Sequence, residues 1–247
     1  MNDTQAARQA ILKRLKESAP CPFTQSRQEP TPTEDPTIGT ETLVKEFSDH
    51  AVFAGAVVRR IPGLGRAGAG VVSFMKELGF SSALLSGERI VEASDIRAAL
   101  VAAGLRVSVQ GKDASVHREL SFASDAGITG ALCGIAETGT VVLSLGGGYS
   151  RLISHAPFAH IVLLPVRDIV TDTHQFWSRV TDYGLYTERR ASDFGEPKTN
   201  TRSRSRTSAR PPSVVFVTGP SMTADIALTA IRGIHGPGKM LILLLDQ

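Results

Sequence analysis

The chain has 247 residues, of which 42% are hydrophobic and 21% charged, a composition typical of a globular protein with a sizeable core. Its net charge of +3 and its sequence pI near 9.0 are a small excess for a nucleic-acid binder, and they suit an anionic small ligand equally well. The two cysteines, Cys21 and Cys133, belong to no Cys-x-x-Cys pair or Cys/His cluster, which excludes a zinc or iron–sulfur site built from this chain alone.

The first 40 residues differ in character from the rest. Residues 6–15 place apolar side chains on one side of a helix and basic ones elsewhere, whereas residues 19–40 contain five prolines and little periodicity. The charged start lacks the apolar core of a signal peptide, and no later run has the length of a membrane helix. We therefore expect a cytoplasmic protein with an N-terminal helix and Pro-rich linker at residues 1–40, followed by one α/β domain at residues 41–247.

Helices and strands alternate in the first part of this domain. The apolar spacing predicts helices that end at Gly79 and Gly104, the second with Ser94 as its N-cap. Strands separated by helices of this length predict a parallel sheet with helices on both faces. In chain order the segments are a helix at 41–55, a strand at 56–61, a helix at 66–79, a strand at 82–86, a helix at 94–104 and a strand at 105–110.

The second part is richer in strands. A short Glu-Thr-Gly stretch separates two β-rich runs at 128–136 and 140–146, which predicts a tight turn or corner. Continuous apolar runs are typical of strands buried on both faces, and they occur at 159–166, 213–219 and 239–245. We expect helices at 171–186 and 220–233.

An Arg-rich loop is expected at 187–213, where the chain has six arginines, one lysine and few apolar residues. One interpretation is a solvated surface loop. The alternatives are a basic lid over an anionic ligand or a contact for an acidic partner. Nucleic acid ranks behind these, because the arginines do not alternate with aromatic stacking residues.

The stretch TGPSMTADIALT at 218–229 is a candidate anion site. A strand followed by Gly219-Pro220 and by Ser221 at a helix start would present free backbone N–H groups at the carboxyl edge of a parallel sheet. A carboxylate or phosphate is well served there. The alternative is that Ser221 is only an N-cap, with Asp225 complementing the helix dipole.

Two further stretches carry candidate ligand groups. His235 lies in GIHGPGK, where Gly233 can end a helix, and its imidazole is either a general acid or base or part of a structural turn. The glycines at 146–148 allow a backbone to come close to a ligand, although they match no nucleotide-binding pattern. Arg151 suits a bidentate carboxylate or phosphate contact, or else it pairs with Glu137.

Glu137 is the only charged residue between Ala126 and Ser150. A carboxylate among apolar strand residues needs a partner, a hydrogen bond or a proton. Gly139 can take the positive φ of a tight turn, and Thr138 and Thr140 supply hydroxyls that can hold the carboxylate. Glu137 is then a general base or a nucleophile, or else a turn residue paired with Arg151 or bound to backbone N–H groups.

Three stretches, AETGT, GPSxTADI and GxHGP, occur in an order that resembles the LUD domain of the lactate utilization protein C family, most strongly over residues 127–170 and 214–246. The resemblance implies a three-layer α/β/α domain of the NagB/RpiA/CoA-transferase-like superfamily with a mostly parallel central sheet. It also implies a role with two iron–sulfur partner proteins in oxidation of L-lactate to pyruvate, with no cofactor in this chain.

The resemblance also suggests a site. Related CoA-transferases use a glutamate in a Glu-Asn-Gly loop as an acyl-accepting nucleophile, and Glu137-Thr138-Gly139 is similar except for Thr138. The Arg-rich loop and His155 depart from the family. With Glu137 and His235 as candidate catalytic residues and no metal ligands, the expected ligand-binding residues are Thr138, Gly139, Thr140, Gly146, Gly147, Gly148, Arg151, Gly219, Pro220, Ser221, Thr223 and Asp225.

Three functions are compatible with these observations. The first is a lactate-oxidation subunit that binds a small carboxylate or phosphate and works with iron–sulfur partners. The second is a stand-alone enzyme of acyl or phospho-sugar chemistry. The third is an assembly module without chemistry, in which the N-terminal helix and the Arg-rich loop bind a partner.

Overall fold

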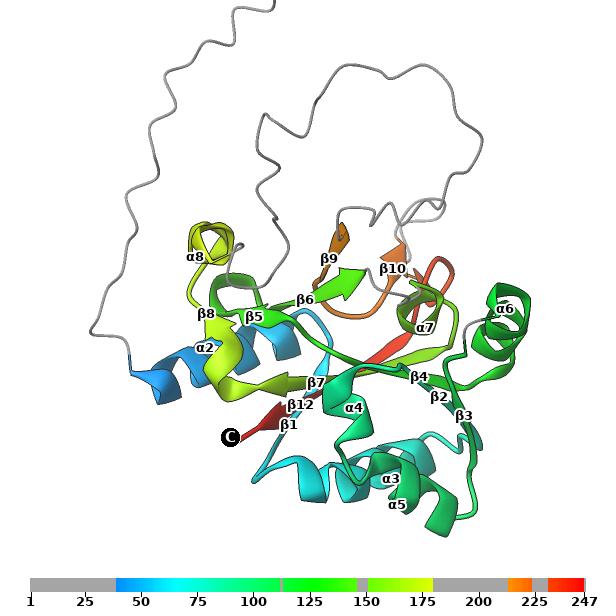
Figure 1. The fold of residues 1–247 in the computed structure, drawn as a ribbon. Helices are drawn as coiled ribbons and strands as arrows, with labels where there is room; N and C mark the ends of the chain where they lie inside the picture. The colour runs from blue at the N-terminus through cyan, green and yellow to red at the C-terminus, as the bar shows by residue number, and fades with distance from the viewer. Residues whose placement is uncertain (1–38, 112, 146–150, 180–212, 224–230, 247) are drawn as a thin grey trace, which may run out of the picture. The chain divides into compact units, whose positions relative to one another are not determined.

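The computed structural model describes residues 39–111, 113–145, 151–179, 213–223 and 231–246 (Figure 1). The expected N-terminal helix and almost all of the Arg-rich loop lie outside these residues, so the domain boundary at residue 40 stays a prediction. No helix in the described part is long and apolar enough to cross a membrane.

A six-stranded sheet forms the centre of the domain, and every neighbouring pair of its strands is parallel, as the sequence predicts. The strand order is β1-β12-β7-β4-β2-β3. The strands are β1 (Val57–Ile61), β2 (Ser82–Leu85), β3 (Arg106–Val109), β4 (Ala126–Gly130), β7 (Ala159–Pro165) and β12 (Lys239–Leu245).

The two most apolar runs of the sequence lie in the middle of this sheet. β7 is buried at every residue and β12 at every residue after Lys239, because both faces of these strands are covered. They pair in register from Ala159 opposite Lys239 to Pro165 opposite Leu245. The prediction of doubly buried strands is confirmed for both runs.

One face of the sheet is covered by α3 (Ala67–Glu77) and α5 (Ile96–Ala102), which pack in one apolar cluster with alternate residues of the strands. The predicted ends of these helices are confirmed by the left-handed φ of 68° at Gly79 and 79° at Gly104. Two further helices were not predicted from the sequence, α4 (Arg89–Glu92) and α6 (Ala114–Ala123).

The opposite face is covered by α2 (Thr40–Phe53) and by a second sheet (Figure 1). Phe47 of α2 is completely buried, and its ring lies against Gly134 of the second sheet. This sheet has the order β8-β5-β6-β9 and consists of β5 (Cys133–Ile135), β6 (Thr140–Leu145), β8 (Ile169–Val170) and β9 (Ser213–Val217).

Two expected strands are therefore placed differently from the prediction. The run at 128–136 is not one strand, because β4 ends at Gly130 and β5 continues in the second sheet. The run at 213–219 does not form a doubly buried strand either. Among the described strands, β9 pairs with β6 alone, and its Phe216 is exposed.

The expected helix at 220–233 is wrong at both of its described ends. Met222–Thr223 forms β10 and Ile231–Arg232 forms β11, and the two pair antiparallel. The helix expected at 171–186 is described only to Arg179, and it contains α8 (Thr173–Ser178). The remaining described helical segments are α7 (Leu152–His155) and the 3₁₀ turns η1 (Leu64–Arg66), η2 (Ala136–Thr138) and η3 (Val166–Asp168).

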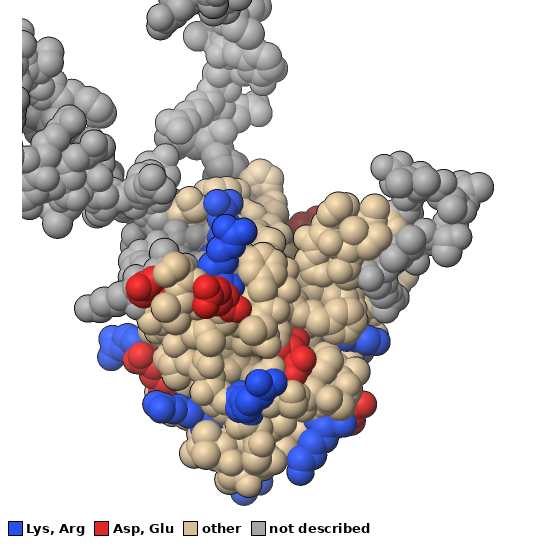
Figure 2. Space-filling view, turned by 90° about the vertical axis from the view of Figure 1, so that its right-hand side faces the viewer, with Lys and Arg blue, Asp and Glu red and all other residues tan. Residues whose placement is uncertain are grey.

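Basic and acidic side chains alternate over the described part of the face drawn in Figure 2, without a patch of one sign. Several basic residues are paired, including Arg59 with Glu77 and Arg60 with Glu41. This distribution differs from the continuous basic stripe typical of nucleic-acid-binding surfaces.

Candidate functional site

Three motifs that are far apart in the sequence meet in the structure. The hydroxyl of Thr140, which follows η2, lies 2.6 Å from the hydroxyl of Thr218, which follows β9. The backbone N–H of Ser221 donates to the carbonyl oxygen of Pro237 at 2.8 Å, and Gly233 donates to the carbonyl oxygen of Ser221 at 3.1 Å. We call the segments 136–140, 218–221 and 233–238 together the three-motif cluster.

Two glycines bring the cluster against the last turn of α2. Gly139 and Gly219 have φ values of 63° and 77°, in the left-handed region that favours glycine. A Cβ on Gly139 would overlap the backbone nitrogen of Ala51, and one on Gly219 would overlap the carbonyl oxygen of Ala54. Both turns therefore require glycine for close approach as well as for φ. The prediction of a tight turn with positive φ at Gly139 is confirmed.

The cluster lies at the amino edge of the central sheet and not at the expected carboxyl edge. Gly219 contacts Ala54, shortly before β1 begins, and Gly238 immediately precedes β12. The prediction of the carboxyl edge assumed that β9 is a strand of the central sheet and that a helix follows it. In the structure β9 belongs to the second sheet, and the strand β10 follows it. The cluster contacts the C-terminal end of α2, whose dipole favours cations rather than anions.

Ser221 therefore has a role different from the predicted one. It is not the N-cap of a helix, because Met222 pairs with Arg232 in a β-bridge. Its backbone N–H donates to Pro237 within the cluster, so this N–H is not free to bind an anion. The hydroxyl of Ser221 makes no hydrogen bond to another described residue.

Glu137 is exposed, which explains how one carboxylate fits into an apolar stretch of sequence. The chain leaves β5 through η2, and this turn directs Glu137 to the surface before β6 begins. Its backbone N–H donates to the carbonyl oxygen of Thr171 at 2.9 Å, which fixes the turn. Thr138 is also exposed, and its hydroxyl lies 2.7 Å from that of Thr140.

The other expected site residues are only partly brought together. Arg151 is exposed at the start of α7, and among the described residues it forms no ion pair with Glu137. His235 is exposed in the turn between β11 and β12, Pro220 is buried, and Thr223 pairs with Ile231. Gly146, Gly147, Gly148 and Asp225 lie outside the described residues.

A buried histidine lies near α7. His160 in β7 is 1% exposed, and its Nε2 lies 2.9 Å from the hydroxyl of Thr129 in β4. Its Nδ1 has no hydrogen-bond partner among the described residues. Burial, and to a smaller extent the nearby His155, lower the pKa of His160 to about 3, so the ring is neutral at pH 7.

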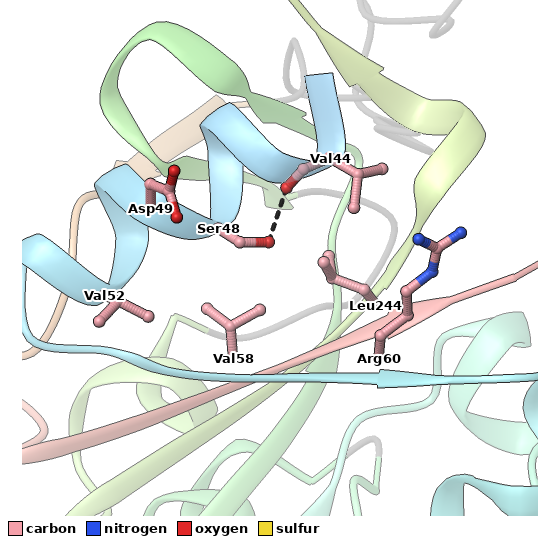
Figure 3. A pocket seen from close by; sticks show the side chains of 7 residues that line it. All are labelled: Val44, Ser48, Asp49, Val52, Val58, Arg60 and Leu244. Atoms are coloured by element: carbon pink, nitrogen blue, oxygen red, sulfur yellow. Dashed lines mark hydrogen bonds between the residues drawn. The ribbon is translucent and has the colours of Figure 1, made fainter. Parts of the chain in front are cut away.

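Figure 3 shows a groove of about 340 Å³ between α2 and β1, with an apolar floor that includes Val58 and Leu244. Arg60 stands at one end of it. The guanidinium group of Arg60 already donates to Glu41 at 2.6 and 2.7 Å and to Asp246 at 2.7 Å. These carboxylates neutralise Arg60, the cationic group among the described lining residues, so this part of the groove favours no anion.

A glycine pattern after β1 was missed in the sequence. GLGRAG at 63–68 has the G-x-G-x-x-G spacing and joins β1 to α3, beside a cavity of about 480 Å³. The fold does not support dinucleotide binding there. Gly68 donates its N–H to Asp95 at 2.7 Å, which occupies the helix start, and β1 and β2 are separated by three strands. A Cβ on Gly68 would overlap Ala99, so helix packing accounts for that glycine.

Glu88 was also missed, because Ser86 and Gly87 separate it from β2 and its backbone partner, Gly130, is far from it in the sequence. It follows β2, is half-buried, and its Oε2 accepts a hydrogen bond from the hydroxyl of Ser86 at 2.9 Å. The same oxygen accepts the backbone N–H of Gly130, the last residue of β4. Burial raises the pKa of Glu88, and these two hydrogen bonds oppose the rise.

No group of three or more His, Cys, Asp or Glu side chains suited to a metal ion occurs in the described part of the chain. Cys133 is completely buried in β5.

The chain matches the family model described as the LUD domain over residues 2–245. It is 32% identical over 126 residues to a protein of Exiguobacterium sp. named lactate utilization protein C, covering 50% of this chain and 45% of the relative. A protein of the same name from Oceanobacillus iheyensis is 30% identical over 140 residues, covering 54% of this chain and 50% of the relative. The chain thus spans about half the length of these relatives.

A solved structure has the same fold. The crystal structure of a DUF162 family protein from Deinococcus radiodurans aligns with a TM-score of 0.51 at 18% sequence identity. The alignment covers 84% of this chain and 99% of that chain.

Proposed function

Because the chain belongs to the LUD domain family, we propose that it is a component of a lactate-utilising system, and that it supports oxidation of L-lactate to pyruvate together with iron–sulfur partner proteins. The names of the relatives from Exiguobacterium and Oceanobacillus support the pathway. The observation that carries the proposal is the hydrogen bonding that joins the three-motif cluster, since it gathers the stretches of the family resemblance at one place.

The exposed groups of the cluster define what it offers a ligand. Glu137 supplies a carboxylate, Thr138 a hydroxyl and His235 an imidazole, and all three side chains are exposed. The hydroxyl and the imidazole can donate to the oxygens of a small organic acid, whereas the carboxylate of Glu137 can only accept, so it would meet the hydroxyl of such an acid and not its carboxylate. We propose that the cluster binds such an acid in the cytoplasm, with His235 as one of the side chains that contact it.

Growth on L-lactate tests the role in the pathway. Deleting the gene is expected to abolish growth on L-lactate and to leave growth on pyruvate intact. The wild-type gene should restore growth, and so should Glu119→Gln, a matched change of an exposed carboxylate on α6. Glu137→Gln should not restore it. Normal growth of the deletion strain on L-lactate would contradict the pathway role.

Co-purification tests the partners. The tagged full chain, isolated from cells grown on L-lactate, is expected to retain proteins with the visible absorption of iron–sulfur clusters. Material of the same purity from cells grown without lactate serves as the control. Isolation of the chain alone from lactate-grown cells, after mild cross-linking, would contradict the assembly.

One observation favours a second candidate, an acyl-transfer enzyme. Glu137 stands exposed on a rigid turn, and this is the placement that a carboxylate nucleophile requires. The carboxylate of Glu137 should then attack the thioester carbon of acetyl-CoA and release the CoA thiolate, which in turn displaces acetate and leaves a Glu137–CoA thioester. Borohydride reduces this thioester to an alcohol and hydroxylamine converts it to a hydroxamate, and mass spectrometry detects either change of mass at Glu137. An unmodified Glu137 under these conditions would exclude acyl transfer from acetyl-CoA.

A further inference from the structure

The connections of the central sheet define a switch point between β2 and β4. After β2 the chain continues into α4 and α5, and α5 packs on one face of the sheet. After β4 it continues into β5 and β6, and β6 packs over the opposite face. β2 and β4 are neighbours, and ligands of parallel α/β sheets bind outside the carboxyl ends of such a pair.

Glu88 is located at this switch point. It follows the carboxyl end of β2, and it accepts the N–H of Gly130 at the carboxyl end of β4. This edge is opposite the one where the three-motif cluster lies, so Glu88 belongs to no site described above.

The two carboxyl oxygens of Glu88 have different surroundings. Oε2 accepts from both Ser86 and Gly130, whereas no described residue donates to Oε1. A proton on the carboxyl group therefore resides on Oε1, since Oε2 already accepts from two donors. Oε1–H is then a fixed donor with no partner in the described part of the protein.

Among the described residues, no opposite charge contributes to the pKa of Glu88. β2 and β4 contribute the Ser86 hydroxyl and the Gly130 N–H, and the charged side chains of α4, Arg89 and Glu92, are exposed. Asp168, which follows β7 at the same edge, is a carboxyl group whose pKa is also raised by burial, with Arg167 opposing the rise. Burial therefore shifts Glu88 toward its neutral form, while the hydrogen bonds from Gly130 and Ser86 act against this shift.

We propose that Glu88 is the hydrogen-bond donor of a second ligand site, outside the carboxyl ends of β2 and β4, which binds a 2-hydroxy or 2-oxo acid through its hydroxyl or carbonyl oxygen. The choice of this ligand class rests on the proposed function, whereas the site rests on the geometry of Glu88. A negatively charged acid selects the neutral carboxyl group, because an ionised Glu88 would repel it and would lack the donated proton.

The test is the affinity of the full chain for pyruvate and L-lactate, measured by calorimetry from pH 5 to pH 8. Wild-type affinity should fall with rising pH, approaching tenfold per unit above the pKa of Glu88, because one proton must be bound with the ligand. Glu88→Gln keeps a neutral donor, so its affinity should be independent of pH. Glu88→Ala should bind at least tenfold more weakly at pH 5. Acetate, which lacks the second oxygen, should also bind at least tenfold more weakly.

Glu92→Gln is the matched control, since it removes a neighbouring exposed carboxylate and should retain the wild-type pH dependence. The thermal unfolding of each variant, and the amide NMR signal of Gly130, show whether the strand ends remain intact. The inference is overturned if the wild-type chain binds neither acid, if Glu88→Gln keeps the wild-type pH dependence, or if Glu88→Ala binds as wild type does. These binding results do not test the role in the pathway. If the deletion strain fails to grow on L-lactate, the proposed function is supported even when the Glu88 site is disproved.

Discussion

The hydroxyl groups of Thr140 and Thr218 share a hydrogen bond of 2.6 Å between positions that are 78 residues apart in the chain. This bond links the turn that carries Glu137 to the end of β9. Thr140 is 4% exposed and Thr218 is exposed, so the bond joins a buried hydroxyl to a surface one and contributes to the position of both motifs. A double-mutant cycle can measure this contribution separately from the other contacts of each residue.

Thr140→Val and Thr218→Val remove this bond from either side. Thr140→Val should lower the free energy of unfolding by about 1–3 kcal/mol, since it also removes the hydroxyl that contacts Thr138. The coupling energy between the two substitutions should be about 0.5–1.5 kcal/mol, and urea unfolding of the four proteins measures it. Strictly additive effects would show that the two hydroxyls do not stabilise one another.

Gly139→Ala tests the close approach of the Glu137 turn to α2. The new Cβ would overlap Ala51, and the backbone would have to keep a left-handed φ of 63°. We expect a loss of about 2–5 kcal/mol from the combined strain and overlap, measured by urea unfolding. Gly65→Ala is the matched control, because a Cβ there meets no atom within 4 Å. Equal stability of the two variants would contradict the packing described.

His160 predicts a pH dependence of stability. Burial holds its pKa at about 3 in the folded protein, whereas an unfolded histidine has a pKa of about 6.5. Between these values the unfolded chain binds more protons, so this contribution is complete above about pH 6.5 and decreases as the pH falls, by at most about 1.4 kcal/mol per unit. His160→Asn should therefore lose less stability than wild type between pH 7 and pH 5.5 in urea unfolding. Parallel losses in the two proteins would rule this out.

Sequence patterns predicted the central sheet well because the physical signal was local. The apolar runs of β7 and β12 indicated strands covered on both faces, and Gly79 and Gly104 marked helix ends through their conformational freedom. The family resemblance read from AETGT, GPSxTADI and GxHGP is confirmed by the family match.

The errors arose where tertiary contacts decide the structure. The residues after Ser221 have the composition of a helix start, yet Met222 and Thr223 are extended because they pair with Arg232 and Ile231. The second sheet also changed the expected edge of the site, since β9 pairs with β6 rather than with a central strand. No local pattern contains the information that two strands belong to different sheets. Glu88 escaped notice because its significance depends on Gly130, which is far from it in the sequence.

Ser221 separates the backbone contribution of the three-motif cluster from its side-chain contribution. Its N–H donates to Pro237 and its carbonyl accepts from Gly233, so these contacts do not depend on the hydroxyl. Ser221→Ala should change the free energy of unfolding by less than about 0.5 kcal/mol, as for a surface substitution. Ser221→Pro removes the N–H and leaves the carbonyl of Pro237 without its donor, which should cost about 1–3 kcal/mol. Thermal and urea unfolding measure both. If Ser221→Ala is as destabilising as Ser221→Pro, then the hydroxyl, and not the backbone, joins these two motifs.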